Sequence, residues 1–279
     1  MTVAYRPVGT FAWTVLGTDD NAPYRVFHDV SGIAKGTLLE YRVVIKDDTG
    51  RITATSTTAV VGDPPPAPGT GGGPVTQPGA VAVAGTFNTE MGCTADWMPD
   101  CTQAQLTLDA ADKIWKGTYT LPAASYGYKV AIDKAWTENY GAGGVPNGPN
   151  IDMSAPATPV TFYYDHGTHY VTSDAEGPII TIPGSFQSEL GCAADWTPSC
   201  MRPWLQDVDG DGTYTWVTTL IPAGTYEYKV AYGLSFTENY GVSGVLNGAN
   251  LSVTVPTNSR VTFTYVKSTH LATAIVSPA

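Results

Sequence analysis

Two short loops of this sequence hold residues whose types and spacing could do chemistry. Each loop is bounded by two cysteines with seven residues between them and has a tryptophan four residues after the first cysteine. The loops are Cys93–Cys101, with Trp97, and Cys192–Cys200, with Trp196. A tryptophan on a closed surface loop would be a rigid, flat platform for the apolar C–H faces of a sugar. The alternative is that each ring covers the core of its domain.

The matched cysteine spacing predicts one disulfide in each loop, Cys93 with Cys101 and Cys192 with Cys200. Closing a loop of this length would stabilise it by about 2.5 kcal/mol. Zinc is the alternative, but no further cysteine or histidine completes a four-ligand set at the usual spacing. Disulfides persist in oxidising compartments, so we expect a secreted, extracellular protein.

A second repeated segment, Thr-Glu-Asn-Tyr-Gly, follows a predicted strand and leads into a glycine-rich loop. Its aromatic rings could stack on a sugar, and its polar groups could hydrogen-bond vicinal hydroxyls. The candidates are Lys134, Trp136, Glu138, Asn139 and Tyr140 in the first copy and Phe236, Glu238, Asn239 and Tyr240 in the second. The alternative is a structured turn in which Asn and Glu satisfy the loop backbone. For Asn147, Gly148 and Asn150 the turn is the favoured interpretation.

One acidic segment partly matches a calcium-binding loop. Asp207, Asp209, Asp211 and Gly212 occupy positions 1, 3, 5 and 6 of that pattern. Position 12, where such loops carry a bidentate Glu, is Thr218. A hairpin turn is therefore the favoured interpretation and calcium the alternative, and we expect no other cofactor.

Catalytic motifs are missing from the sequence. None of the four histidines has near it a cysteine or serine on the tight turn that presents a catalytic nucleophile. The GxSxG, HExxH and P-loop patterns do not occur. Glu138 and Asp96 could pair as glycosidase carboxylates, but sandwich repeats of this size rarely hold a cleft deep enough to exclude water. Duplication also favours binding, since two weak sites gain avidity. We therefore expect no catalytic residues and no enzymatic activity.

The charge of the chain excludes several partners. Its 14 Lys and Arg against 25 Asp and Glu give a net charge of −11. Nucleic acids and anionic membranes are bound through basic residues, so we expect neither as a partner. The sequence has no signal peptide and no apolar run long enough to span a membrane. It begins in what reads as mid-domain sequence, and we expect a fragment of a longer secreted protein.

The candidate residues belong to a long internal repeat. The cysteine loops recur at an offset of 99 residues, Tyr-x-Tyr-Lys-Val-Ala at 100 and Val-Thr-Phe-x-Tyr at 101. A period of this length is a complete domain used twice rather than a solenoid unit. We assign 1–62 to a first domain, 63–79 to a Pro/Gly linker, 80–172 to repeat 1 and 179–279 to repeat 2.

Short alternating segments between turn residues predict that both repeats are antiparallel β-sandwiches. Expected strands are Val81–Ala84, Lys113–Leu121, Tyr126–Ile132 and Val160–Tyr164 in repeat 1, and Ile179–Ile182, Thr213–Ile221, Tyr226–Tyr232 and Val261–Tyr265 in repeat 2. We expect the second and third strands of each set to pair as a hairpin.

The N-terminal domain shows the same patterning. Its expected strands are Phe11–Leu16, Tyr24–Val30, Leu38–Lys46 and Ile52–Val61. The run Leu-Glu-Tyr-Arg-Val-Val-Ile-Lys-Asp from Leu39 resembles the late strands of a fibronectin type III or immunoglobulin-like domain. Such a domain needs about 90 to 100 residues, so this one would be partial. The expected fold class is all-β, with three consecutive immunoglobulin-like sandwiches.

The combined motif of the repeats resembles a known family. It comprises E-x-G-C-x-A-D-W-x-P-x-C, then Y-x-Y-K-V-A, T-E-N-Y-G, N-G-x-N and a closing V-T-F-x-Y. This pattern resembles the accessory modules of bacterial pullulanases and amylopullulanases, which are immunoglobulin-like and similar to the starch-binding domains of bacterial surface starch-capture proteins.

The resemblance implies that the partner is an α-glucan, such as starch, glycogen, pullulan or maltooligosaccharides. It also implies a covalently linked catalytic domain in a larger secreted glycoside hydrolase. The matching aromatics are Trp97 and Trp196, Trp136 and Phe236, and Tyr140 and Tyr240. Because Phe is smaller than Trp, the second site would be weaker or differently tuned.

We expect a monomer whose single sites bind with dissociation constants of about 10 μM to 1 mM. One alternative is a structural spacer that orients a catalytic domain without binding sugar. Another is a module for protein adhesion, which would need an exposed apolar patch of several hundred Å².

Overall fold

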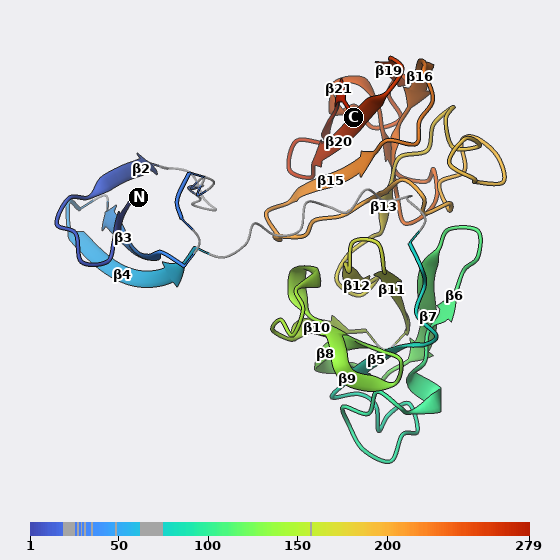
Figure 1. Ribbon diagram of the computed structural model, residues 1–279, viewed down its shortest axis with the longest axis horizontal. Helices are drawn as coiled ribbons and strands as arrows, with labels where there is room; N and C mark the ends of the chain where they lie inside the picture. The colour runs from blue at the N-terminus through green and yellow to red at the C-terminus, as the bar shows by residue number, and fades with distance from the viewer. Residues whose placement is uncertain are drawn as a thin grey trace. The chain divides into compact units, whose positions relative to one another are not determined.

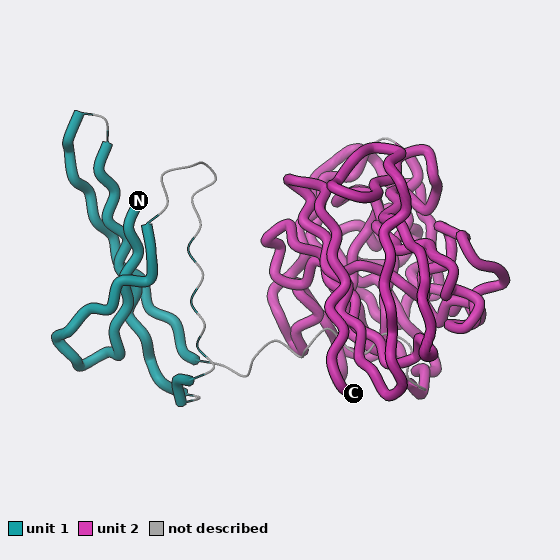
Figure 2. Tube along the Cα trace, turned by 90° about the horizontal axis from the view of Figure 1, so that it is seen from above, with its two compact units in different colours: residues 1–66 teal, residues 67–279 magenta. Residues whose placement is uncertain are grey.

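The computed structural model describes residues 1–18, 26, 28, 30, 32–34, 36–47, 49–61, 75–156 and 158–279. The chain divides into two compact units, Met1–Pro66 and Ala67–Ala279 (Figure 2). Nearly all of the described regular structure is antiparallel β-sheet, which confirms the predicted fold class. The expected strand Tyr24–Val30 and most of the linker 63–79 lie outside the described residues.

The first unit contains one four-stranded sheet in the order β2-β1-β3-β4. Its strands are β1 (Thr2–Pro7), β2 (Thr14–Thr18), β3 (Leu38–Lys46) and β4 (Ile52–Val60). Sequence analysis missed β1, which pairs with both β2 and β3. Among the described residues of this unit, the buried hydrophobic side chains are Val3, Leu39 and Val61, a small core for a sheet of this size.

Repeat 1 is a sandwich of two sheets (Figure 1). One sheet has the order β10-β8-β5 with β9 also paired to β8, and the other has the order β12-β11-β7-β6. The elements are β5 (Val81–Gly85), η1 (Thr102–Ala104), β6 (Thr107–Leu108), β7 (Ile114–Thr120), β8 (Ala124–Ile132), β9 (Ala135–Tyr140), η2 (Ala142–Gly144), β10 (Ile151–Ala155), β11 (Pro159–Asp165) and β12 (Val171–Ser173). Alternate residues of both sheets meet in one core, where Tyr128 and Phe162 pack edge to face at 5.1 Å.

Repeat 2 has the same plan, with one sheet split by a break in its central strand. The elements are β13 (Ile180–Thr181), β14 (Trp204–Leu205), β15 (Thr213–Thr218), β16 (Gly224–Tyr228), β17 (Val230–Tyr232), β18 (Asn239–Tyr240), η3 (Val242–Gly244), β19 (Leu251–Val255), β20 (Ser259–Val266) and β21 (Leu271–Pro278). The sheets are β14-β13-β17-β18, β16-β19 and β15-β20-β21. Tyr228 and Phe263 repeat the edge-to-face pair at 5.1 Å.

The predicted hairpins between the second and third expected strands were wrong. In repeat 1, β7 pairs with β11 and β6, whereas β8 pairs with β5, β9 and β10. In repeat 2, β15 pairs with β20 and β16 with β19. The two strands lie in opposite sheets and send alternate side chains into the same core. Alternation therefore identified each strand as half-buried but could not assign it to a sheet.

Candidate functional site

Both cysteine loops are closed by disulfides. Cys93 bonds to Cys101 and Cys192 to Cys200, with Cα atoms 5.8 Å and 6.0 Å apart. No free cysteine remains, so the predicted pairing is confirmed. Each disulfide closes a loop that projects from the end of the first strand of its repeat.

A buried amide fixes each loop from inside. The Asn88 side chain accepts hydrogen bonds from the Gly85 and Met98 backbone N–H groups, both at 3.1 Å, and donates to the Val83 carbonyl at 3.1 Å. Gln187 takes its place in repeat 2, where it accepts from the Thr197 N–H at 2.7 Å. Buried amides with satisfied partners make a loop rigid, so the tryptophan between these anchors has a fixed position.

The backbone at both tryptophans is left-handed, with φ of 58° at Trp97 and 57° at Trp196. This conformation is unusual for a bulky residue and persists only where its surroundings impose it. The Trp97 N–H donates to the Gly85 carbonyl at 3.0 Å. A Cβ at Gly85 would lie 2.5 Å from the Gly127 carbonyl oxygen, so only glycine allows the loop to cross this close to β8.

The Trp97 ring faces Trp136, and together they line a shallow hollow on repeat 1. The ring centroids are 6.2 Å apart and the rings are inclined at 44°. Lys129 and Asn150 complete the lining of this hollow of about 280 Å³. We call it the tryptophan hollow. Trp136 is 37% exposed, and Trp97 is half-buried, so Trp97 packs against its neighbours and still offers part of its ring to the hollow.

Lys129 and Asn150 are polar groups of this hollow. Lys129 alternates on β8 with the buried Tyr128 and Val130, so its side chain leaves the outer face of the sheet. Neither Lys129 nor Asn150 has a side-chain hydrogen bond or ion pair within the described part of the chain. Sequence analysis did not choose Lys129 and assigned Asn150 to a turn. The repeated lysine of Tyr-x-Tyr-Lys-Val-Ala was the available signal, because it interrupts the apolar end of a strand.

Tyr140 and Tyr240, predicted to stack on sugar, are instead buried. Tyr140 lies parallel to His169 at 4.0 Å and donates its hydroxyl to the Glu138 carboxylate at 2.9 Å. Burial raises the pKa of Tyr140, and the bond to Glu138 raises it further. Tyr240 makes the same contacts with His270 and Glu238. The stacking prediction is corrected, because these ring faces are already covered by protein.

Asn139 and Asn239 are also buried rather than turned to solvent. Asn139 donates to the Trp136 carbonyl at 2.9 Å and to the Asn147 side chain at 2.8 Å. Asn239 makes the same two bonds, to Phe236 and Asn247. The prediction that these amides bind sugar hydroxyls is therefore corrected: they satisfy the loop, and they hold the backbone that carries Trp136 and Phe236.

Lys134 occupies the two-residue turn between β8 and β9 and is exposed. Asp133 and Lys134 both have positive φ, 50° and 60°, as a type I′ turn requires. The structure brings Trp97 and Trp136 together in one hollow but does not include Lys134 or Glu138 in its lining.

One protein-family model matches both repeats. The family model described as "Pullulanase X25 domain" matches residues 80–171 and again 179–272. The chain belongs to the pullulanase X25 domain family. The X25 domain is an accessory domain and not the catalytic domain of these enzymes, which confirms the prediction of a non-catalytic region.

Curated relatives of the X25 pair are large enzymes. An amylopullulanase of Thermoanaerobacterium thermosulfurigenes is 35% identical over 157 residues, which cover 54% of this chain and 8% of the relative. An amylopullulanase of Thermoanaerobacter thermohydrosulfuricus is 30% identical over 210 residues, which cover 70% of this chain and 13% of the relative. The chain thus spans only a small part of the relatives it matches.

Two solved structures also align with the chain. Pullulanase from Bacillus acidopullulyticus aligns at 13% identity and a TM-score of 0.31, over 86% of this chain and 33% of that chain. SusF from Bacteroides thetaiotaomicron aligns at 14% identity and a TM-score of 0.27, over 88% of this chain and 58% of that chain.

The corresponding surface of the second X25 repeat differs in its polar groups. The Lys229 ammonium donates to the Asn239 side chain at 3.0 Å, and Asn250 donates to Glu227 at 3.1 Å. Phe236 is 39% exposed, and no ring contact joins it to the half-buried Trp196 within the described residues. The groups that are free in repeat 1 are thus satisfied internally in repeat 2.

The three aspartates of the second X25 repeat come together, with one carboxylate oxygen of each within 4.8 Å of the others. They also build the turn, since Asp207 accepts from the Gly212 N–H at 3.0 Å and Asp211 from the Thr213 N–H at 2.6 Å. Burial raises the pKa of Asp207, and the charges of Asp211 and Asp209 raise it further. A cation would relieve this repulsion, so calcium binding stays a prediction.

If calcium binds, it should stabilise the second X25 repeat. At a calcium concentration tenfold above the dissociation constant, the gain in unfolding free energy would be about 1.4 kcal/mol. Thermal unfolding of the chain with and without calcium measures this, with Asp209→Asn as the control that should lose the effect. An unchanged unfolding temperature up to millimolar calcium would show that these aspartates only stabilise the turn and bind no calcium.

None of the helices in the described part of the chain has the length and apolar character needed to cross a membrane.

Proposed function

We propose that the X25 pair binds α-glucan chains, such as starch, glycogen, pullulan and maltooligosaccharides, without hydrolysing them. The observation that carries this proposal is the tryptophan hollow of repeat 1. Two indole rings meet there at 6.2 Å beside Lys129 and Asn150, which have no partners of their own in the described residues. Such a site offers stacking faces and hydrogen-bond donors but no pair of carboxylates.

The geometry of the hollow suits a glucose chain. Each glucose ring has an apolar C–H face and a rim of hydroxyls, so an aromatic face and an amine or amide can engage both at once. Because the loop and strand already fix both rings, binding loses little side-chain entropy. The 44° inclination between Trp97 and Trp136 fits a curved α-linked chain better than the flat chain of a β-linked glucan such as cellulose.

The wider role is inferred from the larger enzymes in which related X25 domains occur. Since relatives are named amylopullulanases and the chain spans 8% to 13% of their length, we place the pair in an accessory region of a larger starch-degrading enzyme. There it would be covalently linked to a catalytic domain and would hold that domain on its polymer. The two disulfides support a secreted location. The pair would act as a monomer.

A spacer role is the second candidate, and one observation favours it for repeat 2. Lys229 and Asn250 are bonded to Asn239 and Glu227, so this repeat has fewer groups ready for a ligand. In this arrangement repeat 1 would bind the glucan and repeat 2 would mainly set its position.

Affinity electrophoresis of the full chain tests the proposal. We expect soluble starch and pullulan in the gel to retard the chain, and a soluble cellulose derivative to leave its mobility unchanged. The variant Trp97→Ala/Trp136→Ala should lose most of the retardation. Equal mobility of the wild-type chain in all gels would refute the glucan proposal and favour the spacer.

A further inference from the structure

The surface between the two X25 repeats is a packed apolar contact rather than a loose join. Ile114 and Tyr163 of repeat 1 and Ile179, Met201 and Trp204 of repeat 2 form one buried cluster. We call this set the junction cluster. Trp204 is only 2% exposed and meets Tyr163 edge to face at 6.3 Å. A buried tryptophan shared between two domains resists their relative rotation.

Polar contacts flank the junction cluster. The Arg202 guanidinium donates to the Ala111 carbonyl at 2.8 Å, and the Gln206 side chain donates to the Asp165 carboxylate at 3.0 Å. A further close approach joins the two repeats, since a Cβ at Gly143 would lie 2.7 Å from the Val208 carbonyl oxygen. The loops of the two repeats therefore approach as closely as backbone groups allow.

The connecting segment is itself anchored to repeat 1. The Glu176 carboxylate accepts hydrogen bonds from the hydroxyls of Tyr128, in the core, and Ser173. Asp174 exchanges two bonds with Thr161 of β11, at 2.9 Å and 3.0 Å. The residues that join the repeats are thus held by the sandwich before them and cannot act as a free linker.

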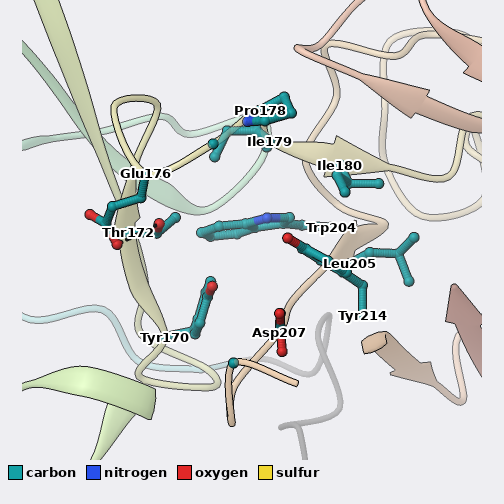
Figure 3. A pocket seen from close by; sticks show the side chains of 12 residues that line it. Tyr170, Thr172, Glu176, Pro178, Ile179, Ile180, Trp204, Leu205, Asp207 and Tyr214 are labelled. Carbon is teal, nitrogen blue, oxygen red and sulfur yellow. Dashed lines mark hydrogen bonds between the residues drawn. The ribbon is translucent and has the colours of Figure 1, made fainter. Parts of the chain in front are cut away.

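Figure 3 shows how the two repeats close around a small hollow at the junction. Tyr170 and Thr172 line it from repeat 1, Glu176 from the connecting segment, and Trp204, Asp207 and Tyr214 from repeat 2. The Trp204 ring lies across the middle of this view, between the groups of the two repeats.

The internal repeat shows that these apolar residues serve the junction and not the fold. The disulfides and strand registers align the two copies position by position. Met201 and Trp204 of the junction cluster, and Leu234, which packs against it, align with Thr102, Gln105 and Lys134 of repeat 1. Junction residues Ile114 and Tyr163 of repeat 1 align with Thr213 and Thr264 of repeat 2.

At these five positions the residue is therefore apolar on the joined side and polar at the equivalent open side, whereas Ile179 aligns with Ala80, which is also apolar. Leu234 illustrates this, because it packs against the junction cluster while its counterpart Lys134 is exposed. A residue needed for the sandwich itself would be apolar in both copies. The difference assigns these side chains to the contact between repeats.

We propose that the two X25 repeats form a single rigid body that presents its two sugar-binding surfaces at a fixed distance and angle. The glucan part of this inference rests on the proposed function. A polymer long enough to reach both surfaces would meet a preorganised pair, whereas an oligosaccharide would occupy one surface at a time. The junction thereby makes the pair selective for polymer over short chains.

Residual dipolar couplings of the isotopically labelled full chain test the rigid pair. We expect one common alignment tensor for repeats 1 and 2. The variant Trp204→Gln/Leu234→Lys gives repeat 2 the residues that repeat 1 has at the equivalent positions. In repeat 1 the Gln105 side chain donates to two carbonyl groups of the cysteine loop, at 2.8 Å and 3.0 Å, so a glutamine at this position is compatible with the fold. This variant should give two different tensors with both repeats folded. The control Leu246→Lys makes the same leucine-to-lysine substitution at an exposed site outside the junction cluster, and it should keep one tensor.

Two different tensors in the wild-type chain would overturn the rigid pair whatever the variants do. Sugar binding is read separately. For the junction variant we expect roughly a fivefold weaker affinity for starch polymer and an unchanged affinity for maltoheptaose. Equal polymer affinity would overturn the selectivity. A single tensor without any glucan binding would support the rigid pair and refute the proposed function instead.

Discussion

Replacing Trp136 with alanine should weaken the binding of maltoheptaose to repeat 1 by about tenfold, or about 1.4 kcal/mol. Trp136 is 37% exposed and faces Trp97 across the tryptophan hollow, so the change removes one stacking face and leaves the other without its neighbour. Burying an indole face on a sugar supplies a contribution of this order. Isothermal titration calorimetry of the full chain measures the loss.

The control for this change is Phe236→Ala, at the equivalent position of repeat 2. It removes a ring of similar exposure, 39%, but leaves the tryptophan hollow intact. The fold should survive both changes because neither ring belongs to the buried core clusters. An affinity of the Trp136→Ala variant equal to wild type would remove Trp136 from the site.

The second large effect is a gain of binding in repeat 2. Glu227 holds Asn250 at 3.1 Å, and repeat 1 has Gly127 at the equivalent position. The double variant Glu227→Gly/Phe236→Trp should release Asn250 and restore the larger ring. We expect about tenfold tighter binding of maltoheptaose by repeat 2, since a freed donor and a larger stacking face together supply about 1.4 kcal/mol.

Each single variant provides the control for this gain. Phe236→Trp alone should give part of it, because Asn250 remains bonded to Glu227. Glu227→Gly alone should also give part of it, because the smaller ring remains. Titrations are made in the background Trp136→Ala so that the signal comes from repeat 2. No gain in the double variant would mean that the internal bonds of repeat 2 do not limit its binding.

The repeat and the disulfides could be predicted because the same residues recur at the same spacing in both copies. Cys93 and Cys101 recur 99 residues later, and the loop they close has no competing metal ligands. The two tryptophans of the hollow could be chosen from sequence only as separate candidates. Both Trp97 and Trp136 were named as candidates because they stand in segments that repeat, but the sequence left open whether Trp97 covers the core, and it did not show that the two rings meet.

The buried members of the repeated segment could not be separated from the exposed ones by sequence. Asn139 and Tyr140 recur because the loop needs them, to hold Asn147 and to stack on His169. A residue can recur in both copies because the fold needs it or because the function needs it, and the repeat alone does not distinguish the two. Lys129 was overlooked although this lysine recurs in both copies of Tyr-x-Tyr-Lys-Val-Ala, because an outward position on a strand does not show which loop lies beside it.

Strand pairing and the junction depended on tertiary structure. Both β7 and β8 alternate in the same way, and only the closed sandwich shows that they lie in opposite sheets. Sequence analysis assigned no role to Trp204, whose ring partner Tyr163 lies in the other repeat. The mismatch of Trp204 with Gln105 was visible in the alignment of the copies, but its meaning needed the contact itself.

The most direct test of the central claim follows the indole N–H signals of the tryptophans by nuclear magnetic resonance during titration with maltoheptaose. The signals of Trp97 and Trp136 should shift together and saturate with one dissociation constant, while the buried Trp115, Trp204 and Trp216 should not move. A cellulose oligosaccharide of equal length should leave all of them in place. Saturating maltoheptaose without a shift at Trp97 and Trp136 would contradict the account.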